Sequence, residues 1–235
     1  LRDVVGRTKM PGGVRADLYR ELDKLAREAA KSEFPADLAD FRAVAPYNDL
    51  HRRIIKLHSR VLAQRGKEGI VLWTSPPYEI LPLYAFPAMP LHALDLALLG
   101  NERRAVVFNV LNAGDKEETL SFKLQGLPGG TNPGSIRVFQ VEYADTREGV
   151  LVASALIPVP EKFQTYTAAV PAGMTRQIWL SVDSRSIEPG KYYGRVNLTW
   201  QIDDQRMVYA TWSQGYRPVG INRRSTLLPY TSDFL

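Results

Sequence analysis

The sequence predicts a mainly β protein, an antiparallel β-sandwich of the immunoglobulin or jelly-roll kind preceded by an α-helical hairpin. Three observations lead to this fold class. Apolar residues recur at helical spacing within residues 1–69. From residue 91 onward, short runs of alternating apolar and polar residues are divided by turn signals such as NAGD, GLPGG, PAG and EPG. No helical stretch separates these runs, so a parallel α/β sheet is not expected.

Two helices are expected in the helical hairpin segment, residues 1–69. The first covers residues 14–31, and the second begins at Asn48, a residue type that caps helix N-termini well. Pro35 interrupts the connection and Gly66 is a helix stop, so the pair is expected to pack antiparallel, on the rest of the chain or on another chain. The apolar stripes are Leu18, Leu22, Leu25 and Ala29 in the first helix and Leu50, Ile54, Leu57 and Val61 in the second.

The rest of the chain divides into three parts. Residues 70–92 are expected to be a proline-rich linker, because proline is excluded from central strands. Residues 93–213 are expected to form the β-sandwich, and residues 214–235 an extended tail. The expected strands are Ala93–Leu98, Arg104–Leu111, Thr119–Leu124, Ile136–Tyr143, Leu151–Pro158, Gln164–Val170, Gln177–Val182, Tyr192–Trp200 and Arg206–Trp212.

Composition narrows the classes of function. A chain of 235 residues can bury a real hydrophobic core. The absence of cysteine excludes disulfides, thiolate catalysis and cysteine-ligated metal sites, and it fits either a cytosolic protein or an exported bacterial one. The longest apolar run, Ile80–Leu99, is broken by prolines, His92 and Asp95, so no membrane span is expected. The chain starts at Leu1 rather than methionine, and we therefore expect a processed or excised fragment.

The net charge of +5 is concentrated at one end. Residues 1–69 hold 15 Lys and Arg against 10 Asp and Glu, whereas the remaining residues hold 15 of each. A basic helical segment is a hint of an acidic partner, but a solvated helix face is the favoured interpretation. Nucleic acid is not an expected partner.

No catalytic signature is found in the sequence. His51 and His58 are seven residues apart and can share a helix face, yet no nearby carboxylate completes a metal-ligand set. Asp203 and Asp204 are most simply a tight hairpin turn. We therefore expect no catalytic residue, no metal and no cofactor in this chain.

Aromatic residues are the remaining candidates for ligand contact, since flat rings suit the apolar faces of sugars. Strand alternation places Tyr192 on an apolar face and Tyr193 on the opposite, polar face, while Trp179 lies opposite its apolar neighbours. Trp179 and Tyr193 are thus the candidate ligand-binding residues, although packing in a core or an interface is the favoured role for the aromatic set. That set is Trp73, Tyr78, Trp179, Tyr192, Tyr193, Trp200, Trp212 and Tyr216.

Three segments together resemble a known family. LWTSPPYEILPL, LALLGNERRAVVFNVLNAGDKEETLSFKLQGLPG and VPAGMTRQIWLSVDSRSIEPGKYYGRVNLT are similar, in order and spacing, to the N-terminal β-sandwich of glycoside hydrolase family 123-like bacterial proteins. The resemblance covers about residues 71–200. The matching positions are structural in the family: Gly100, Asn101, Glu102, Gly173, Gln177, Trp179, Leu180, Pro189, Gly190, Tyr192 and Gly194.

The resemblance implies that catalysis belongs to a (β/α)₈ barrel that follows the sandwich and acts on acetamido sugars through an adjacent acidic pair. The sequence ends at Leu235, before such a barrel, so no catalytic residue is carried over. We expect a non-catalytic accessory or scaffolding module of a larger exported, periplasmic or secreted, carbohydrate-active protein, with a contribution to glycan contact. Its partners would be a neighbouring domain of the parent protein, or other subunits, and a glycan. The alternative is a structural protein that forms subunit contacts in a surface layer or filament; a self-sufficient enzyme is the least favoured reading.

Overall fold

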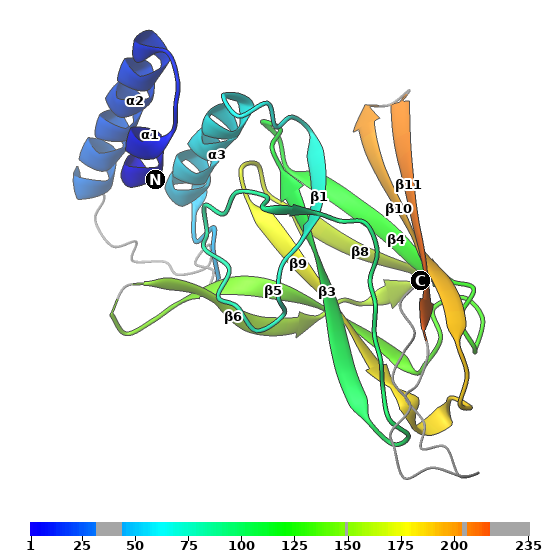
Figure 1. The fold of residues 1–235 in the computed structure, drawn as a ribbon. Helices are drawn as coiled ribbons and strands as arrows, with labels where there is room; N and C mark the ends of the chain where they lie inside the picture. Colours follow the sequence, from blue (N-terminus) through cyan, green and yellow to red (C-terminus); the bar gives the residue numbers. More distant parts are fainter. Residues whose placement is uncertain (32–43, 149, 204–205, 217–235) are drawn as a thin grey trace.

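The computed structural model describes residues 1–31, 44–148, 150–203 and 206–216 of the chain. Within these residues, three α-helices precede a β-rich region (Figure 1). The helices are α1 (Arg2–Arg7), α2 (Gly12–Lys31) and α3 (Asp49–Ala63). The strands are β1 (Ile70–Thr74), β2 (Met89–Pro90), β3 (Arg103–Asn112), β4 (Glu118–Gln125), β5 (Ile136–Asp145), β6 (Leu151–Pro158), β7 (Glu161–Lys162), β8 (Thr165–Val170), β9 (Thr175–Asp183), β10 (Tyr192–Asp203) and β11 (Arg206–Tyr216), with the 3₁₀ helix η1 (Ser184–Ser186) before β10.

The strands form two sheets. One has six strands in the order β2-β1-β3-β9-β5-β6, and the other has five in the order β11-β10-β4-β8-β7. Every pairing between these strands is antiparallel. The predicted fold class, an antiparallel β-sandwich preceded by a helical hairpin, is therefore confirmed.

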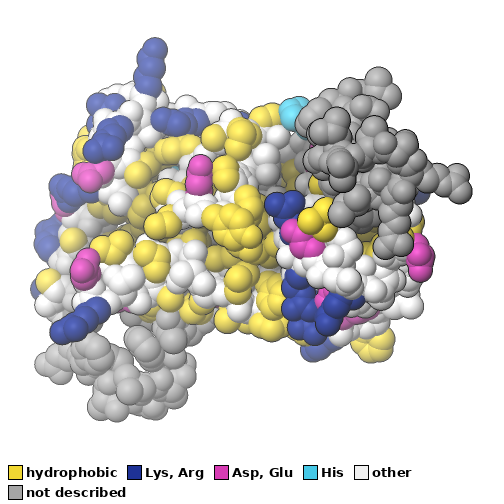
Figure 2. Space-filling view, turned by 60° about the horizontal axis from the view of Figure 1, so that its bottom comes forward, with side chains coloured by type: hydrophobic (Ala, Val, Ile, Leu, Met, Phe, Trp, Pro, Cys, Tyr) yellow, Lys and Arg dark blue, Asp and Glu magenta, His cyan; other side chains and the backbone are white. Residues whose placement is uncertain are grey.

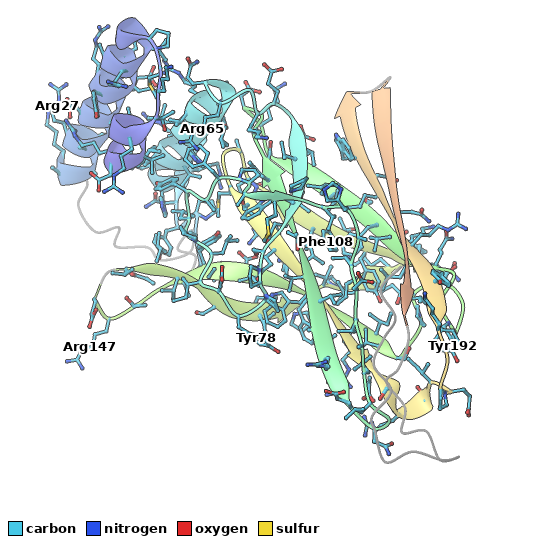
Figure 3. The ribbon with its side chains drawn as sticks, viewed as in Figure 1. Arg27, Arg65, Tyr78, Phe108, Arg147 and Tyr192 are labelled. Carbon is cyan, nitrogen blue, oxygen red and sulfur yellow. The ribbon has the colours of Figure 1, made fainter. Side chains whose placement is uncertain are left out.

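The main core lies between the two sheets. Phe108 of β3 and Phe122 of β4 are both almost fully buried, and their rings meet edge to face with centroids 6.1 Å apart. Figure 3 shows Phe108 in the interior of the sandwich. Leu120, Phe122 and Leu124 are buried on one face of β4, as the alternation of its sequence predicts.

The two longer helices form the expected antiparallel hairpin. Arg60 Nη1 lies 2.9 Å from Glu21 Oε1, and Arg53 Nη1 lies 2.6 Å from Glu28 Oε1, so the direction of α3 is opposite to that of α2. Asn48 caps α3, because its side chain accepts a hydrogen bond from the amide of His51 at 2.8 Å. Among the described helices none is long and apolar enough to cross a membrane.

Helix α3 has a second buried face that its sequence did not reveal. The predicted stripe of Leu57 and Val61 packs against α1 and α2. Ile55 and Leu62 point instead toward the outer surface of the six-stranded sheet, where they join a separate buried cluster with Trp73 of β1. Helix α3 therefore lies between α2 and the sandwich, as Figure 1 shows.

The expected linker over residues 70–92 is partly a strand. Residues 70–73 pair with β3, and Trp73 and Thr74 pair with β2. Prolines follow the run IVLWT but are absent from it, so nothing prevents it from joining the ladder. The later part of the segment covers the outer surface of the sheet through Leu81, Leu83 and Ala85, which are buried.

The expected strand Ala93–Leu98 is wrong. This segment runs without ladder pairing, and Arg104 Nη1 donates a hydrogen bond to the Ala97 carbonyl oxygen at 2.9 Å. The neighbour of β3 on this edge is β1, which pairs with residues 109–112. At the other end, residues 214–216 belong to β11 rather than to a tail. Pro35, Asp204 and residues 217–235 lie outside the described residues.

Candidate ligand-binding site

Trp179 marks a candidate site on the outer surface of the six-stranded sheet. In β9, Ile178 and Leu180 point into the sandwich core, so Trp179 points the other way and is half-buried. The strand register places Val107 of β3 and Phe139 of β5 directly beside it. These three side chains form an apolar row across the outer surface, and the outward position of Trp179 that the sequence indicated is correct.

Tyr78 completes an aromatic pair with Trp179. It lies in the segment after β1 and is 84% exposed. The two rings meet edge to face, with centroids 5.8 Å apart and planes 74° apart. Figure 3 shows the Tyr78 side chain at the outer surface of the sandwich. The sequence analysis included Tyr78 among the aromatic candidates, but nothing in the sequence links two residues that are separated by the seven strands β2 to β8.

A polar cluster holds the indole of Trp179 in place. Its Nε1 donates a hydrogen bond to Gln177 Oε1 at 2.7 Å. Gln177 Nε2 and Asn109 Nδ2 both donate to Ser75 Oγ, at 3.2 Å and 2.9 Å. Asn109 and Gln177 are buried, and the register places them side by side on β3 and β9. The hydrogen bond to buried Gln177 restricts the rotamer of Trp179, so the indole is oriented before any ligand binds.

A groove of about 370 Å³ lies next to this aromatic pair. One wall is the segment from Thr74 to Tyr78, the other is residues 93–97, and the floor is β3 from Arg104 to Val107. Pairing of β3 with β1 stops at Asn109, so on this edge none of the described strands pairs with residues 104–107 of β3, whose other edge is paired with β9. Thr74, Ser75, Asp95 and Arg104 give the groove polar groups beside its apolar ones.

The second sequence candidate, Tyr193, lies elsewhere. It is on β10 in the five-stranded sheet, is 60% exposed, and its ring has the Lys191 ammonium group 5.2 Å from its centre. Since Tyr193 and Trp179 project outward from opposite sheets, the structure does not bring the two candidates together. The other aromatic candidates within the described side chains are in or against a core: Trp73, Tyr192 and Trp200. The side chains of Trp212 and Tyr216 lie outside the described part of the chain.

His51 and His58 pack against aromatic rings, whereas His92 is exposed. His58 is fully buried, and its Nδ1 donates a hydrogen bond to the Gly173 carbonyl oxygen at 2.8 Å. Burial lowers the pKa of His58 to about 4, which keeps the ring neutral. Burial also lowers the pKa of His51. In the described part of the chain, no three His, Asp or Glu side chains come close enough to hold a metal ion.

Comparison with known proteins finds likenesses to solved structures at low sequence identity. No protein-family profile matches the chain, and no curated protein matches it. Three similar solved structures are a family 123 glycoside hydrolase from Clostridium perfringens, described for glycolipid glycan hydrolysis, the periplasmic chaperone SfaE, and the major pilin subunit BcpA of Bacillus cereus. Their identities to this chain are 10%, 12% and 10%, and their TM-scores are 0.42, 0.35 and 0.35.

The three alignments cover 65%, 68% and 65% of this chain. The chain spans 27% of the glycoside hydrolase, 60% of the chaperone and 41% of the pilin. The resemblance to a family 123 glycoside hydrolase that the sequence indicated thus recurs among the solved structures, and at this identity it is a likeness of fold. The fold defines the class of protein as a β-sandwich module with a helical layer.

Proposed function

We propose that this chain is a non-catalytic accessory module of a larger, exported carbohydrate-active protein, and that it contacts a glycan through Tyr78 and Trp179. The observation that carries the proposal is the edge-to-face pair of exposed Tyr78 and half-buried Trp179 beside the hydrogen-bonded cluster of Ser75, Asn109 and Gln177. An exposed aromatic ring that is held rigidly has little conformational entropy to lose when a ligand binds.

The chemistry of the groove suits a sugar. Aromatic rings pack against the C–H faces of a pyranose, and hydroxyl groups require hydrogen-bonding partners. Thr74, Ser75 and Asp95 supply such partners within the groove that begins at Tyr78. The resemblance of residues 71–200 to the sandwich of glycoside hydrolase family 123-like proteins points to the same ligand class.

The helical segment, residues 1–69, and the sandwich form one unit in this proposal, because α3 contributes to both buried clusters outside the main core. A neighbouring domain of the parent protein is the expected partner, and the module orients that domain on its substrate. The location would be periplasmic or secreted, which a cysteine-free sequence with a large core permits.

Titration calorimetry with a panel of neutral and acetamido-sugar oligosaccharides tests the proposal. We expect binding that Tyr78→Ala weakens by at least about tenfold, the size of effect that loss of one aromatic contact produces. Phe163→Ala is the matched control, because Phe163 is 99% exposed on the other side of the molecule, between β7 and β8. The proposal fails if no saccharide binds, or if the two variants lose affinity equally.

One observation favours a second function, assembly with other subunits. Strand β6 is an edge of the six-stranded sheet, carries no charged residue between Leu151 and Pro158, and exposes 45% of Leu156 and 42% of Ile157. Edge strands without charged residues tend to pair with other chains. Concentration-dependent association in sedimentation velocity, abolished by Leu156→Lys, would support this role; a monomer at high concentration would exclude it.

A further inference from the structure

The outer surface of β9 continues from the aromatic row into a row of basic residues. On β9, Ser181 is two residues after Trp179. The strand register places Ser181 between Ala105 of β3 and Arg137 of β5. One step further, Asp183 lies opposite Arg103. Residues i and i+2 of a strand share a face and are about 7 Å apart. The basic row therefore begins about 7 Å from Trp179, close to the width of one sugar ring.

Three arginines, Arg103, Arg137 and Arg185, line a pocket of about 380 Å³ at this end of the sheet. Asp183 holds two of them: its carboxylate accepts from Arg103 Nη2 at 2.6 Å and from Arg185 Nη2 at 2.6 Å. These bonds lower the pKa of Asp183, first through Arg185 and then through Arg103, so it stays ionised. One carboxylate against three guanidinium groups leaves the pocket with an excess of two positive charges.

Arg137 is the group that is free to bind. Its side chain is exposed and, within the described residues, forms neither an ion pair nor a hydrogen bond. Ser135, Ser181 and Ser186 line the same pocket. Guanidinium groups with hydroxyl groups between them match the oxygen atoms of a sulfate or a carboxylate, which arginine binds in a two-pronged geometry. Figure 2 shows that a group of Lys and Arg side chains lies beside the broad hydrophobic area on this side of the molecule.

We propose that the glycan bound by this module is anionic, with one sugar ring stacked on Tyr78 and Trp179 and a sulfate or uronic carboxylate on the next ring bound by Arg137 in the pocket of Arg103 and Arg185. This inference rests on the proposed glycan contact and names its ligand class. The oligosaccharide lies along β9, and the pocket selects it over a neutral chain of the same length. Asp183 keeps Arg103 and Arg185 at the edge of the pocket, which leaves Arg137 to bind the anion.

The test compares three tetrasaccharides by calorimetry at physiological salt: chondroitin sulfate, its desulfated form, and neutral poly-N-acetyllactosamine. We expect one or both anionic tetrasaccharides to bind at least about tenfold more tightly than the neutral one. Preference for the sulfated form assigns the pocket to sulfate, and equal binding of the two anionic forms assigns it to the carboxylate. Arg137→Gln should remove this advantage and leave binding of the neutral chain unchanged.

Arg147→Gln is the matched control, since it removes the same charge from the exposed turn that connects β5 and β6, away from the pocket (Figure 3). Equal losses in Arg137→Gln and Arg147→Gln would mean attraction by net charge alone and would overturn the inference. Binding of the neutral chain with no gain from either anion overturns the inference but leaves the glycan contact standing. Anion binding that Trp179→Ala leaves unchanged contradicts the glycan contact itself.

Discussion

The imidazole Nδ1 of His58 donates a hydrogen bond to the carbonyl oxygen of Gly173, 2.8 Å away and 115 positions later in the sequence. His58 is in the middle of α3, and Gly173 is in the turn between β8 and β9. This bond joins the helical layer to the sandwich at a point where both partners are buried. The rings of Tyr84 and Phe86 approach His58 edge to face and close the site.

Gly173→Ala is expected to separate α3 from the sandwich. Gly173 has φ of +75°, and a Cβ there would lie 2.4 Å from the carbonyl oxygen of Ile55. The left-handed backbone and the clash together should lower the free energy of unfolding by about 2–5 kcal/mol. Urea denaturation followed by circular dichroism measures the change.

Gly130→Ala is the control for that experiment. Gly130 also has positive φ, +84°, but a Cβ there meets nothing within 4 Å. Only the backbone strain remains, so we expect a loss of about 1 kcal/mol. If the two alanine variants lose the same stability, the close approach of α3 to the 171–174 turn is not important for stability.

Stability should fall in mildly acidic solution because of His58. Burial lowers its pKa from 6.5 to about 4 in the folded protein, so the unfolded chain binds the proton more tightly between these pH values. The contribution of His58 to the free energy of unfolding is complete above pH 6.5. About 3 kcal/mol of it is lost as the pH falls toward 4. Urea denaturation at several pH values in this range measures the slope.

His58→Asn separates this share of the slope from that of His51, whose lowered pKa acts in the same direction. The asparagine amide can still donate to the Gly173 carbonyl oxygen, but it does not titrate. We expect a shallower dependence of stability on pH in this variant. An unchanged slope would assign the effect to other groups.

The buried ion pair of Arg176 and Glu142 should be costly to break. Arg176 Nη1 donates to Glu142 Oε2 and to the Val141 carbonyl oxygen, and both charged side chains are almost fully buried. Glu142→Gln would leave the guanidinium charge uncompensated, with an expected loss of about 3–5 kcal/mol. Glu28→Gln, which breaks the exposed pair with Arg53, should cost far less stability, because solvent screens that pair. Thermal unfolding of the two variants compares them, and similar losses would contradict the prediction.

Gln177→Leu should disorder Trp179 without removing it. The substitution takes away the acceptor for the indole N–H, which is 2.7 Å from Gln177 Oε1, and one of the two donors to Ser75. We expect about 1–2 kcal/mol lower stability, because polar groups lose their partners. We also expect a weaker near-ultraviolet circular dichroism signal and about tenfold weaker saccharide binding. Unchanged affinity would show that the orientation of Trp179 does not contribute.

The sequence predicted what depends on local pattern. Alternation of apolar residues located the core strands and put Trp179 and Tyr193 on outward faces, and Asn48 marked the start of α3. It missed what depends on partners far along the chain. The run from Ile70 to Thr74 is too short, and too close to several prolines, to be predicted as a strand from its sequence. It forms a strand because the edge of β3 is available for pairing.

The second buried face of α3 was missed for a similar reason. Ile55, His58 and Leu62 have helical spacing, but a histidine at the centre of the stripe looks polar until Gly173 satisfies it. The pairing of Tyr78 with Trp179 could not be predicted, because it depends on the path of the segment between β1 and β2 over the sheet. The candidate residues could therefore be predicted from the sequence, but the site that they form could not.

The contact between α3 and the 171–174 turn also constrains the order in which the molecule can assemble. During synthesis the helices emerge first, yet the surface that covers Ile55 and His58 is complete only after residue 173 has left the ribosome. Until then the helical pair has one apolar face without its partner, and contacts of such long sequence separation form slowly. Exposed apolar surface makes incomplete chains prone to aggregation, so this face is a liability of the nascent chain until residue 173 has emerged.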